Sequence, residues 1–247
     1  MDDIKIVVPS MGRANRVHTK RIVNDIIIVC PESEVDEYKK YNPELEIVGQ
    51  PEGCKGITQT RAFILDMFDE VFMLDDDVKQ VNRFFTDIGE KYKIENKLLV
   101  RDIIQQTANL ARGMGAKMFG FDHNRSPVTY HANKPFRTTG YLNASHCGFL
   151  KGHGMSYDKS MIEGEDHYIS CLNVYKNRFM LINDRYGFFT EANFKNDGGC
   201  SGSRNVEIMK ENTLKLREYF GDCVHIKKAT ILKTKLNEGE RSISFPY

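Results

Sequence analysis

The chain has 247 residues, of which 40% are hydrophobic, and its formal net charge is +1. This length suits a single domain with a sizeable core, and the near-neutral charge excludes a global field that would attract nucleic acid or a membrane surface. A local basic patch stays compatible with that charge. No apolar run approaches the ~20 residues of a membrane span, so we expect no membrane partner.

The cysteines and the start of the chain indicate the cellular setting. The six cysteines are widely separated and form no C-x-x-C pair, so we do not expect a zinc knuckle. The first residues are acidic and the apolar run after them is short, which argues against a secretory signal peptide. We therefore expect a reducing cytoplasm and free thiols.

The first part of the chain alternates short apolar runs with helical patterns, which is typical of βαβ units. The expected strands are 4–10, 25–31 and 46–48, and the expected helices are 32–41 and 58–68. Thr58 is the predicted N-cap of the second helix. The sequence contains neither a G-x-G-x-x-G nor a P-loop pattern, so those two nucleotide-binding fingerprints do not apply.

The most informative stretch joins four apolar residues, Val71 to Leu74, directly to Asp75, Asp76 and Asp77. The apolar run predicts a buried strand, and its carboxyl end is where open α/β sheets bind ligands. Adjacent carboxylates repel one another unless a cation lies among them. A hard divalent ion carrying a diphosphate would suit them, because such ions prefer carboxylate and phosphate oxygens. A solvated acidic turn after the strand is the alternative.

Polar and cationic side chains surround the expected nucleotide position. Ser10 and Arg13, in the loop after the first strand, could contact a base, a ribose or a phosphate. Lys55 and Arg61 flank the amino end of the second helix, where backbone N–H groups also favour a diphosphate or a base edge. Two alternatives stay open: Arg13 is an ordinary surface arginine, and Arg61 pairs with Asp66 or another surface acid.

The second part begins with an amphipathic helix over 98–114 that is expected to cover the sheet. The further expected strands are 118–121, 147–155, 178–182 and 186–189, with a long basic loop or hairpin at 122–143 and a last helix at 205–220. A Gly/Ser-rich loop at 196–203 could close over a ligand. No second core is evident, so the prediction is one α/β domain spanning 1–247.

One more helix is expected to begin near Gly164. Its buried side is expected to carry Ile169, Leu172 and Tyr175. Glu165 and Asp166 then lie in the first turn, where the helix dipole favours anions. Helix stabilisation alone would explain the two carboxylates. The alternative is a general base at the floor of a substrate pocket.

These features follow one another in an order that resembles the GT-A glycosyltransferases, with their D-x-D metal motif and later E-D motif. Within that superfamily the chain looks most like the phage and bacterial TET/JBP-associated glycosyltransferases, whose inferred role is to transfer a sugar to hydroxymethylated pyrimidines in DNA. The points of likeness are Pro9–Arg13, Gly53–Gly56 leading to Arg61, Leu74–Asp77 and Gly164–His167.

The resemblance implies a single GT-A-like domain, with a mixed, mostly parallel sheet and helices on both faces. It divides the chain into a nucleotide-sugar half, about 1–115, and an acceptor half, about 116–247. Ser10, Arg13 and Arg61 would hold the nucleoside of the donor, a UDP-sugar being expected, and Lys55 would lie near its diphosphate. No obligate protein partner is evident, and the cytoplasm would be the host's if the chain is viral.

The resemblance also implies a divalent cation, Mn²⁺ or Mg²⁺. Asp75 or Asp76 would meet the ribose and a metal-bound water, and Asp77 would ligate the ion between the two phosphates. Many of these folds take a further ligand, often a histidine, from a C-terminal loop. The segment 193–199 contains no histidine, although Asp197 could substitute. The expected metal ligands are therefore Asp77, Asp75 and Asp197.

For the transfer itself, Asp166 or Glu165 would take the proton from an acceptor hydroxyl, which is a poor nucleophile without a base. An inverting displacement is the simplest hypothesis, and retention stays open. A DNA acceptor would need its target base flipped or single-stranded. The basic residues within 123–137 and 225–235 would then contact phosphates.

Three other functions share part of this sequence pattern. A nucleotidyltransferase would share the sheet and the metal, but it usually needs a glycine-rich basic loop after the first strand. A non-catalytic nucleic-acid-binding module is the alternative outside the enzymes. A phosphatase with an aspartate nucleophile is excluded because its motif lies close to the first strand and ends in Thr or Val, where this chain has Lys79.

Overall fold

The computed structural model describes residues 3–85, 92–122, 130–190, 206–226 and 241–245. A large mixed sheet has the strand order β3-β2-β1-β4-β9-β7-β10-β5-β6, and β8 pairs with β10 beside this path. Its strands are β1 Lys5–Pro9, β2 Ile26–Pro31, β3 Glu46–Gln50, β4 Val71–Leu74, β5 Val78–Arg83, β6 Tyr92–Ile94, β7 Met118–Asp122, β8 Phe136–Arg137, β9 His146–Phe149 and β10 Leu181–Thr190. Only β9, β5 and β8 run against the others among the described strands, which confirms the predicted mixed, mostly parallel sheet.

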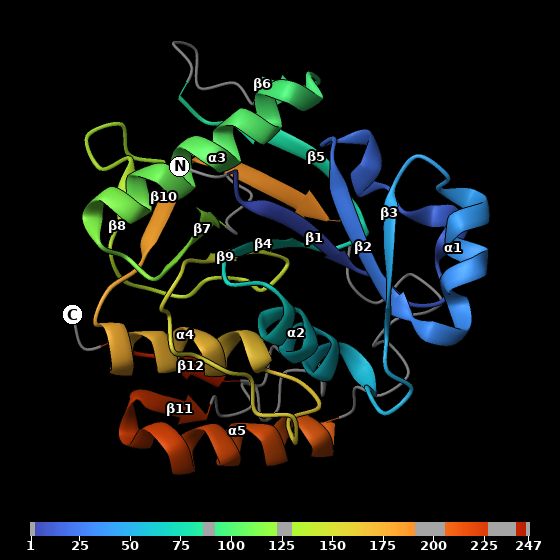
Figure 1. Ribbon diagram of the computed structural model, residues 1–247. Helices are drawn as coiled ribbons and strands as arrows, with labels where there is room; N and C mark the ends of the chain where they lie inside the picture. Colours follow the sequence, from blue (N-terminus) through green and yellow to red (C-terminus); the bar gives the residue numbers. More distant parts are fainter. Residues whose placement is uncertain (1–2, 86–91, 123–129, 191–205, 227–240, 246–247) are drawn as a thin grey trace.

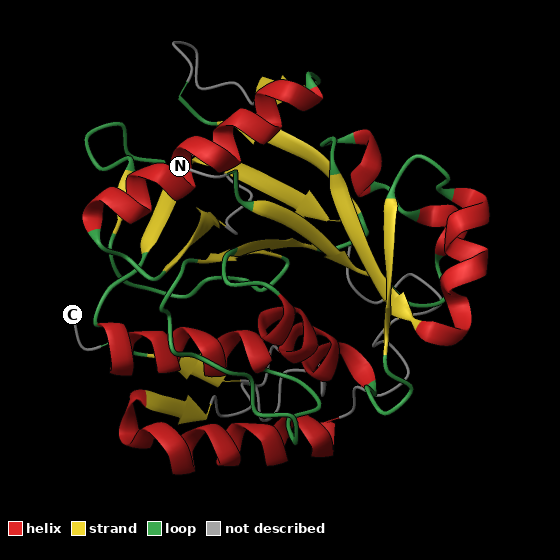
Figure 2. Cartoon of the chain, in the orientation of Figure 1, coloured by secondary structure: helices red, strands yellow, loops and turns green. Residues whose placement is uncertain are grey.

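Helices cover both faces of this sheet (Figures 1 and 2). The helices are α1 Val35–Tyr41, α2 Gly56–Met67, α3 Lys97–Met114, α4 Glu165–Asn177 and α5 Val206–Phe220. On one face, α3 and Tyr38 of α1 pack against the strands in one apolar cluster. On the other face, α2 and α4 pack against the strands in a second cluster. The sheet is therefore buried on both sides, which explains the nearly continuous apolar runs of β1, β2 and β4.

The side chains of β4 alternate between the two faces of the sheet, and so do the carboxylates that follow the strand. Phe72 and Leu74 belong to the cluster on the α3 face, whereas Val71 and Met73 belong to the cluster on the α2 face. Successive residues of a strand point to opposite faces. The carboxylates continue this pattern, because one of them contacts residues on the α1 side and another contacts α2.

A smaller layer lies beyond α4. The strands β11 Val224–Ile226 and β12 Arg241–Ile243 form an antiparallel pair next to α5. Figure 1 shows β12 between α4 and α5. Met161, Leu216 and Val224 form its buried apolar core, with Tyr168 and Phe220 packed against it. In the part of the chain that the structure describes, no helix has the length and apolar character needed to cross a lipid bilayer.

The structure corrects three expectations. Helix α2 begins at Gly56 with Lys55 at the cap position, so Thr58 lies inside the helix and is not its N-cap. Tyr175 is 70% exposed and does not lie on the buried side of α4. The last two strands are one strand, β10, because the polar residues between them have partners: Asn183 donates to Thr107 and Asp184 pairs with Arg137.

Candidate active site

The first cluster of the site fastens the loop after β1 to the strand-end carboxylates. Asp76 is 5% exposed; its Oδ2 accepts a hydrogen bond from Ser10 Oγ at 2.5 Å, and its Oδ1 accepts one from Arg13 Nη1 at 2.9 Å. Tyr38 completes the cluster, with its hydroxyl 2.7 Å from Ser10 Oγ. Burial raises the pKa of Asp76 although Ser10 and Arg13 counteract it. Ser10, Arg13 and Asp76 therefore do lie together, and Arg13 is not an ordinary surface arginine.

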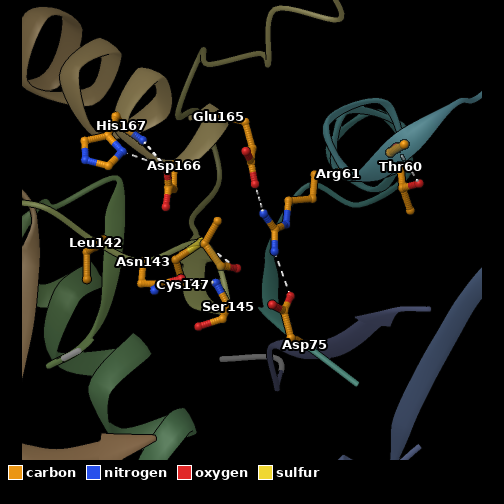
Figure 3. Close-up of polar contacts among 12 residues, drawn as sticks. Thr60, Arg61, Asp75, Leu142, Asn143, Ser145, Cys147, Glu165, Asp166 and His167 are labelled. Atoms are coloured by element: carbon orange, nitrogen blue, oxygen red, sulfur yellow. Dashed lines mark hydrogen bonds and ion pairs between the residues drawn. The ribbon is translucent and has the colours of Figure 1, made fainter. Parts of the chain in front are cut away.

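The second cluster joins the two acidic motifs (Figure 3). Arg61 has a side chain only 4% exposed, and it donates from Nη2 to Asp75 Oδ1 at 2.7 Å and from Nη1 to Glu165 Oε1. Burial opposes its charge, but the two carboxylates outweigh burial and hold its pKa above the ordinary value. The expected alternative, a pair with Asp66, is wrong, because Asp66 pairs with Lys159 instead.

Asp77 differs from its two neighbours in having few partners. Its Oδ1 is buried with no hydrogen-bond partner among the described residues, and its Oδ2 lies 3.9 Å from Arg13 Nη1. Burial, followed by the charges of Asp75 and Asp76, raises the pKa of Asp77 to about 7. A half-buried carboxylate in the field of two others is a group that a divalent cation would stabilise.

The donor set of this corner fits a hard cation. Asp75 and Asp77 offer carboxylate oxygens, which Mn²⁺ and Mg²⁺ prefer, and such ions often take only one or two carboxylates beside phosphate oxygens and water. Within the described residues, no three His, Cys, Asp or Glu side chains gather as a complete metal site. The third expected ligand, Asp197, lies outside the described residues.

The third cluster surrounds Asp166 at the start of α4. Its Oδ2 accepts a hydrogen bond from the Tyr141 hydroxyl, and its Oδ1 lies 2.8 Å from the backbone nitrogen and 2.9 Å from Nδ1 of His167. The Tyr141 and His167 rings face each other with centroids 4.5 Å apart. Burial alone would raise the pKa of Asp166, but His167, Tyr141 and Arg241 outweigh it and hold the pKa well below the ordinary value.

The two carboxylates at the start of α4 thus have different surroundings. Glu165 is directed to Arg61, whereas Asp166 lies beside His167 (Figure 3). Glu165 is buried in its ion pair, and the side chain of Asp166 remains 21% exposed. Of the two expected candidates for a general base, this geometry favours Asp166.

Two other residues with expected binding roles, Lys55 and Arg137, do not join these clusters. Lys55 is exposed, and its backbone N–H donates to Gln59; no contact among the described residues joins its ammonium group to the carboxylates. Arg137 is engaged by Asp184 at 2.5 Å and Asp122 at 3.3 Å, so it is not a free phosphate contact. The segments 123–129 and 227–235, which were expected to supply basic contacts, lie outside the described residues.

Sequence reasoning missed the partners that complete each cluster. Tyr38 was expected only as part of a charged helix, and Tyr141 only as part of a long loop, yet each contacts a site carboxylate or its hydrogen-bond partner. Arg241, which acts on Asp166 through its charge, lay beyond every motif. No spacing signal could have found these three, because their partners are distant in the sequence. Tyr38 lies 28 positions from Ser10, Tyr141 lies 25 from Asp166, and Arg241 lies 78 from Glu163.

Comparison with known proteins shows likeness at the level of the fold and of the family. A search of curated proteins gives no match. Among solved structures, residues 1–349 of TarS from S. aureus superpose with a TM-score of 0.51 at 12% identity, covering 87% of this chain and 66% of that one. The same TarS segment in complex with UDP-GlcNAc gives a TM-score of 0.52 at 11% identity, covering 87% and 67%. This chain therefore spans about two thirds of those TarS chains, and the likeness shows the GT-A fold.

The comparison with sequence-family models identifies the family of the chain. The model of the TET-associated glycosyltransferases matches residues 4–199, which include β1, the three strand-end carboxylates and the start of α4. This match favours a glycosyltransferase over both alternatives, the nucleotidyltransferase and the non-catalytic binding module. The chain belongs to the TET-associated glycosyltransferase family.

Proposed function

We propose that this enzyme transfers a sugar, a hexose unit, from a UDP-sugar to the hydroxyl of a hydroxymethylated pyrimidine in DNA, with the help of Mn²⁺ or Mg²⁺. The observation that carries the proposal is the bridge made by Arg61, which holds Asp75 at the strand end and Glu165 at the start of α4 on one buried guanidinium. The strand-end carboxylates and the first turn of α4, which carries Asp166, are thereby kept beside each other.

The donor side rests on the first cluster and on the neighbouring acids. Arg13, oriented by Asp76, and the residues around it would hold the nucleoside. Asp75 and Asp77, with Asp197 as an expected third ligand, would hold the cation, which when bound neutralises the departing diphosphate. The TarS segment that shares the fold binds UDP-GlcNAc, which supports a uridine diphosphate donor here. The division into a donor half, about 1–115, and an acceptor half, about 116–247, is part of the proposal.

On the acceptor side, Asp166 would accept the proton of the attacking hydroxyl. Tyr141 and His167 hold both of its oxygens in place, so the carboxylate is ionised and oriented before the acceptor arrives. The oxygen of the acceptor then bonds to the anomeric carbon while the bond from that carbon to the diphosphate breaks. With Asp166 as the base, an inverting displacement is the simplest hypothesis for the stereochemical outcome, and retention stays open.

A panel of donors tests the first half of the proposal. Thermal unfolding is followed with UDP-, GDP-, ADP- and dTDP-sugars, each with Mn²⁺ and with EDTA, because a ligand of the folded state raises the melting temperature. We expect a shift with a UDP-sugar only when Mn²⁺ is present. Flat curves with every nucleotide sugar, beside a shift with hydroxymethylated DNA alone, would contradict the donor assignment.

A panel of acceptors tests the second half. Oligonucleotides that carry 5-hydroxymethylcytosine, 5-hydroxymethyluracil or unmodified cytosine are incubated with the donor and Mn²⁺ and then weighed by mass spectrometry. We expect a gain of one sugar residue on a hydroxymethylated strand and none on the unmodified strand. Consumption of donor without a mass gain on any oligonucleotide would exclude DNA as the acceptor.

A further inference from the structure

The strand β12 reaches the start of α4 through one side chain. Arg241 donates from Nη2 to Oε1 of Glu163 at 2.8 Å, and both side chains are only 9% exposed. Nη1 of the same guanidinium lies 3.4 Å from Thr213 Oγ1 on α5. A buried ion pair between these segments is costly to break, because the remaining charge would stay in a low-dielectric place.

The guanidinium also lies directly against Gly164. A Cβ placed on Gly164 would come within 2.6 Å of Arg241 Cζ and Nη1, so no larger side chain fits while Arg241 is in place. Gly164 itself has φ +77° and is the N-cap residue of α4, which begins at Glu165. Two features therefore require glycine at the first position of the Gly164-Glu165-Asp166 motif: its positive φ and the close packing of the Arg241 guanidinium.

We propose that Arg241 is a positioning residue of the transfer reaction, which holds Glu163 and Gly164 and thereby sets the first turn of α4 with its carboxylate Asp166. The inference rests on the proposed role of Asp166 as the base. It extends the site beyond residues 4–199, the part matched by the family, to the last strand of the chain. The layer of α5, β11 and β12 then serves the reaction as well as the fold.

The charge of Arg241 gives the proposal a second, separate consequence. Among the described residues, the titratable and charged groups around Asp166 are His167 and the adjacent Glu165 on its own helix, Tyr141 before β9, Arg241 on β12, and Cys147 and Tyr157. Arg241 favours the ionised carboxylate, as do His167 and Tyr141. Loss of the guanidinium charge therefore raises the pKa of Asp166. At saturating donor and Mn²⁺, where the cation keeps Asp77 ionised, this rise moves the acid limb of the kcat profile to higher pH.

Three variants separate position from charge. Arg241→Gln removes the charge, Arg241→Lys keeps it with a different shape, and Glu163→Gln keeps the guanidinium but weakens its anchor. Arg217→Gln is the matched control, because Arg217 lies on α5 with a side chain 48% exposed and pairs with Asp222, which is 95% exposed. Each is compared with the wild type for donor affinity, kcat, the pH profile of kcat, and hydrogen exchange in the peptide 163–170.

We expect Arg241→Gln to lower kcat on the order of 10- to 100-fold, the size of effect of a slightly misplaced catalytic group. Donor affinity with UDP-GlcNAc and Mn²⁺ should stay unchanged, the acid limb should move to higher pH, and exchange in 163–170 should speed up. In Arg241→Lys, the acid limb should lie at the same pH as in the wild type. Glu163→Gln should lower kcat and leave the pH of the acid limb unchanged. Arg217→Gln should match the wild type in every measurement.

The outcomes distinguish this inference from the proposed function. Wild-type kcat and wild-type exchange in Arg241→Gln, even with a lower melting temperature, would overturn the positioning role while leaving the transferase assignment intact. If the wild type transfers no sugar, the proposed function fails, and the exchange measurement still decides whether Arg241 orders the start of α4. Equal shifts of the acid limb in the Gln and Lys variants would refute the charge effect.

Discussion

Arg61 on α2 donates a hydrogen bond from Nη2 to Oδ1 of Asp75, 2.7 Å away, from a position that is almost fully buried. The contact places a buried cation against the first of the strand-end carboxylates. The same guanidinium binds Glu165. Arg61 thus links the acidic motif after β4 to the acidic motif at the start of α4, and its expected contact with a nucleoside stays a prediction.

The first prediction concerns the stability of this link. Arg61→Met leaves the carboxylate of Glu165, 6% exposed, buried without its cation, which should lower the free energy of unfolding by about 3–5 kcal/mol. Urea denaturation measures the change. Arg217→Met, which breaks an exposed pair, should change the free energy by less than about 0.5 kcal/mol. Equal stabilities of the two variants would show that the buried bridge does not stabilise the fold.

The second prediction concerns the cation. The pKa of Asp77 is raised to about 7, so its carboxyl is largely protonated below that value, and Mn²⁺ must displace the proton there. Calorimetric titration should therefore show that Mn²⁺ affinity, in the presence of UDP, falls as the pH is lowered below about 7. Asp77→Asn should abolish the metal-dependent part of binding. Wild-type Mn²⁺ affinity in that variant would place the ion elsewhere.

The third prediction concerns the centre of the sheet. Gly148 on β9 faces Phe119 so closely that an added Cβ would lie 2.1 Å from the ring, and Gly148→Ala should destabilise the protein by about 1–3 kcal/mol through overpacking. Gly53→Ala is the control, since nothing lies within 4 Å of its Cβ position and its φ is not positive. Equal melting temperatures for the two variants would contradict the packing described here.

Much of the fold could be predicted because the signals are local. The apolar runs that became β1, β2 and β4, and the helical spacing of α3, required only neighbouring residues. The two segments of β10 looked separate for the same reason. Asn183 and Asp184 interrupt the apolar pattern, and their partners, Thr107 and Arg137, are supplied by distant elements.

The sequence predicted which types of residue make up the site, but it predicted few of the contacts between them. The acidic motifs were evident, but their partners are set by tertiary packing, as when Arg61 reaches across 104 residues to Glu165. Tyr141 and Arg241 carry no motif of their own, and their contacts with Asp166 and Gly164 exist only once β9 and β12 are in place. The resemblance supplied roles for the matched residues and could not supply these supporting ones.

The most direct test of the account is the transfer of sugar by Asp166→Asn. The amide keeps the size of the side chain and can still accept hydrogen bonds at its oxygen, but it cannot take a proton from the acceptor. With a UDP-sugar, Mn²⁺ and a hydroxymethylated oligonucleotide, the wild type should add one sugar mass to the strand. Asp166→Asn should bind the donor as the wild type does and add none. Transfer by Asp166→Asn at the wild-type rate would contradict the assignment of Asp166 as the base.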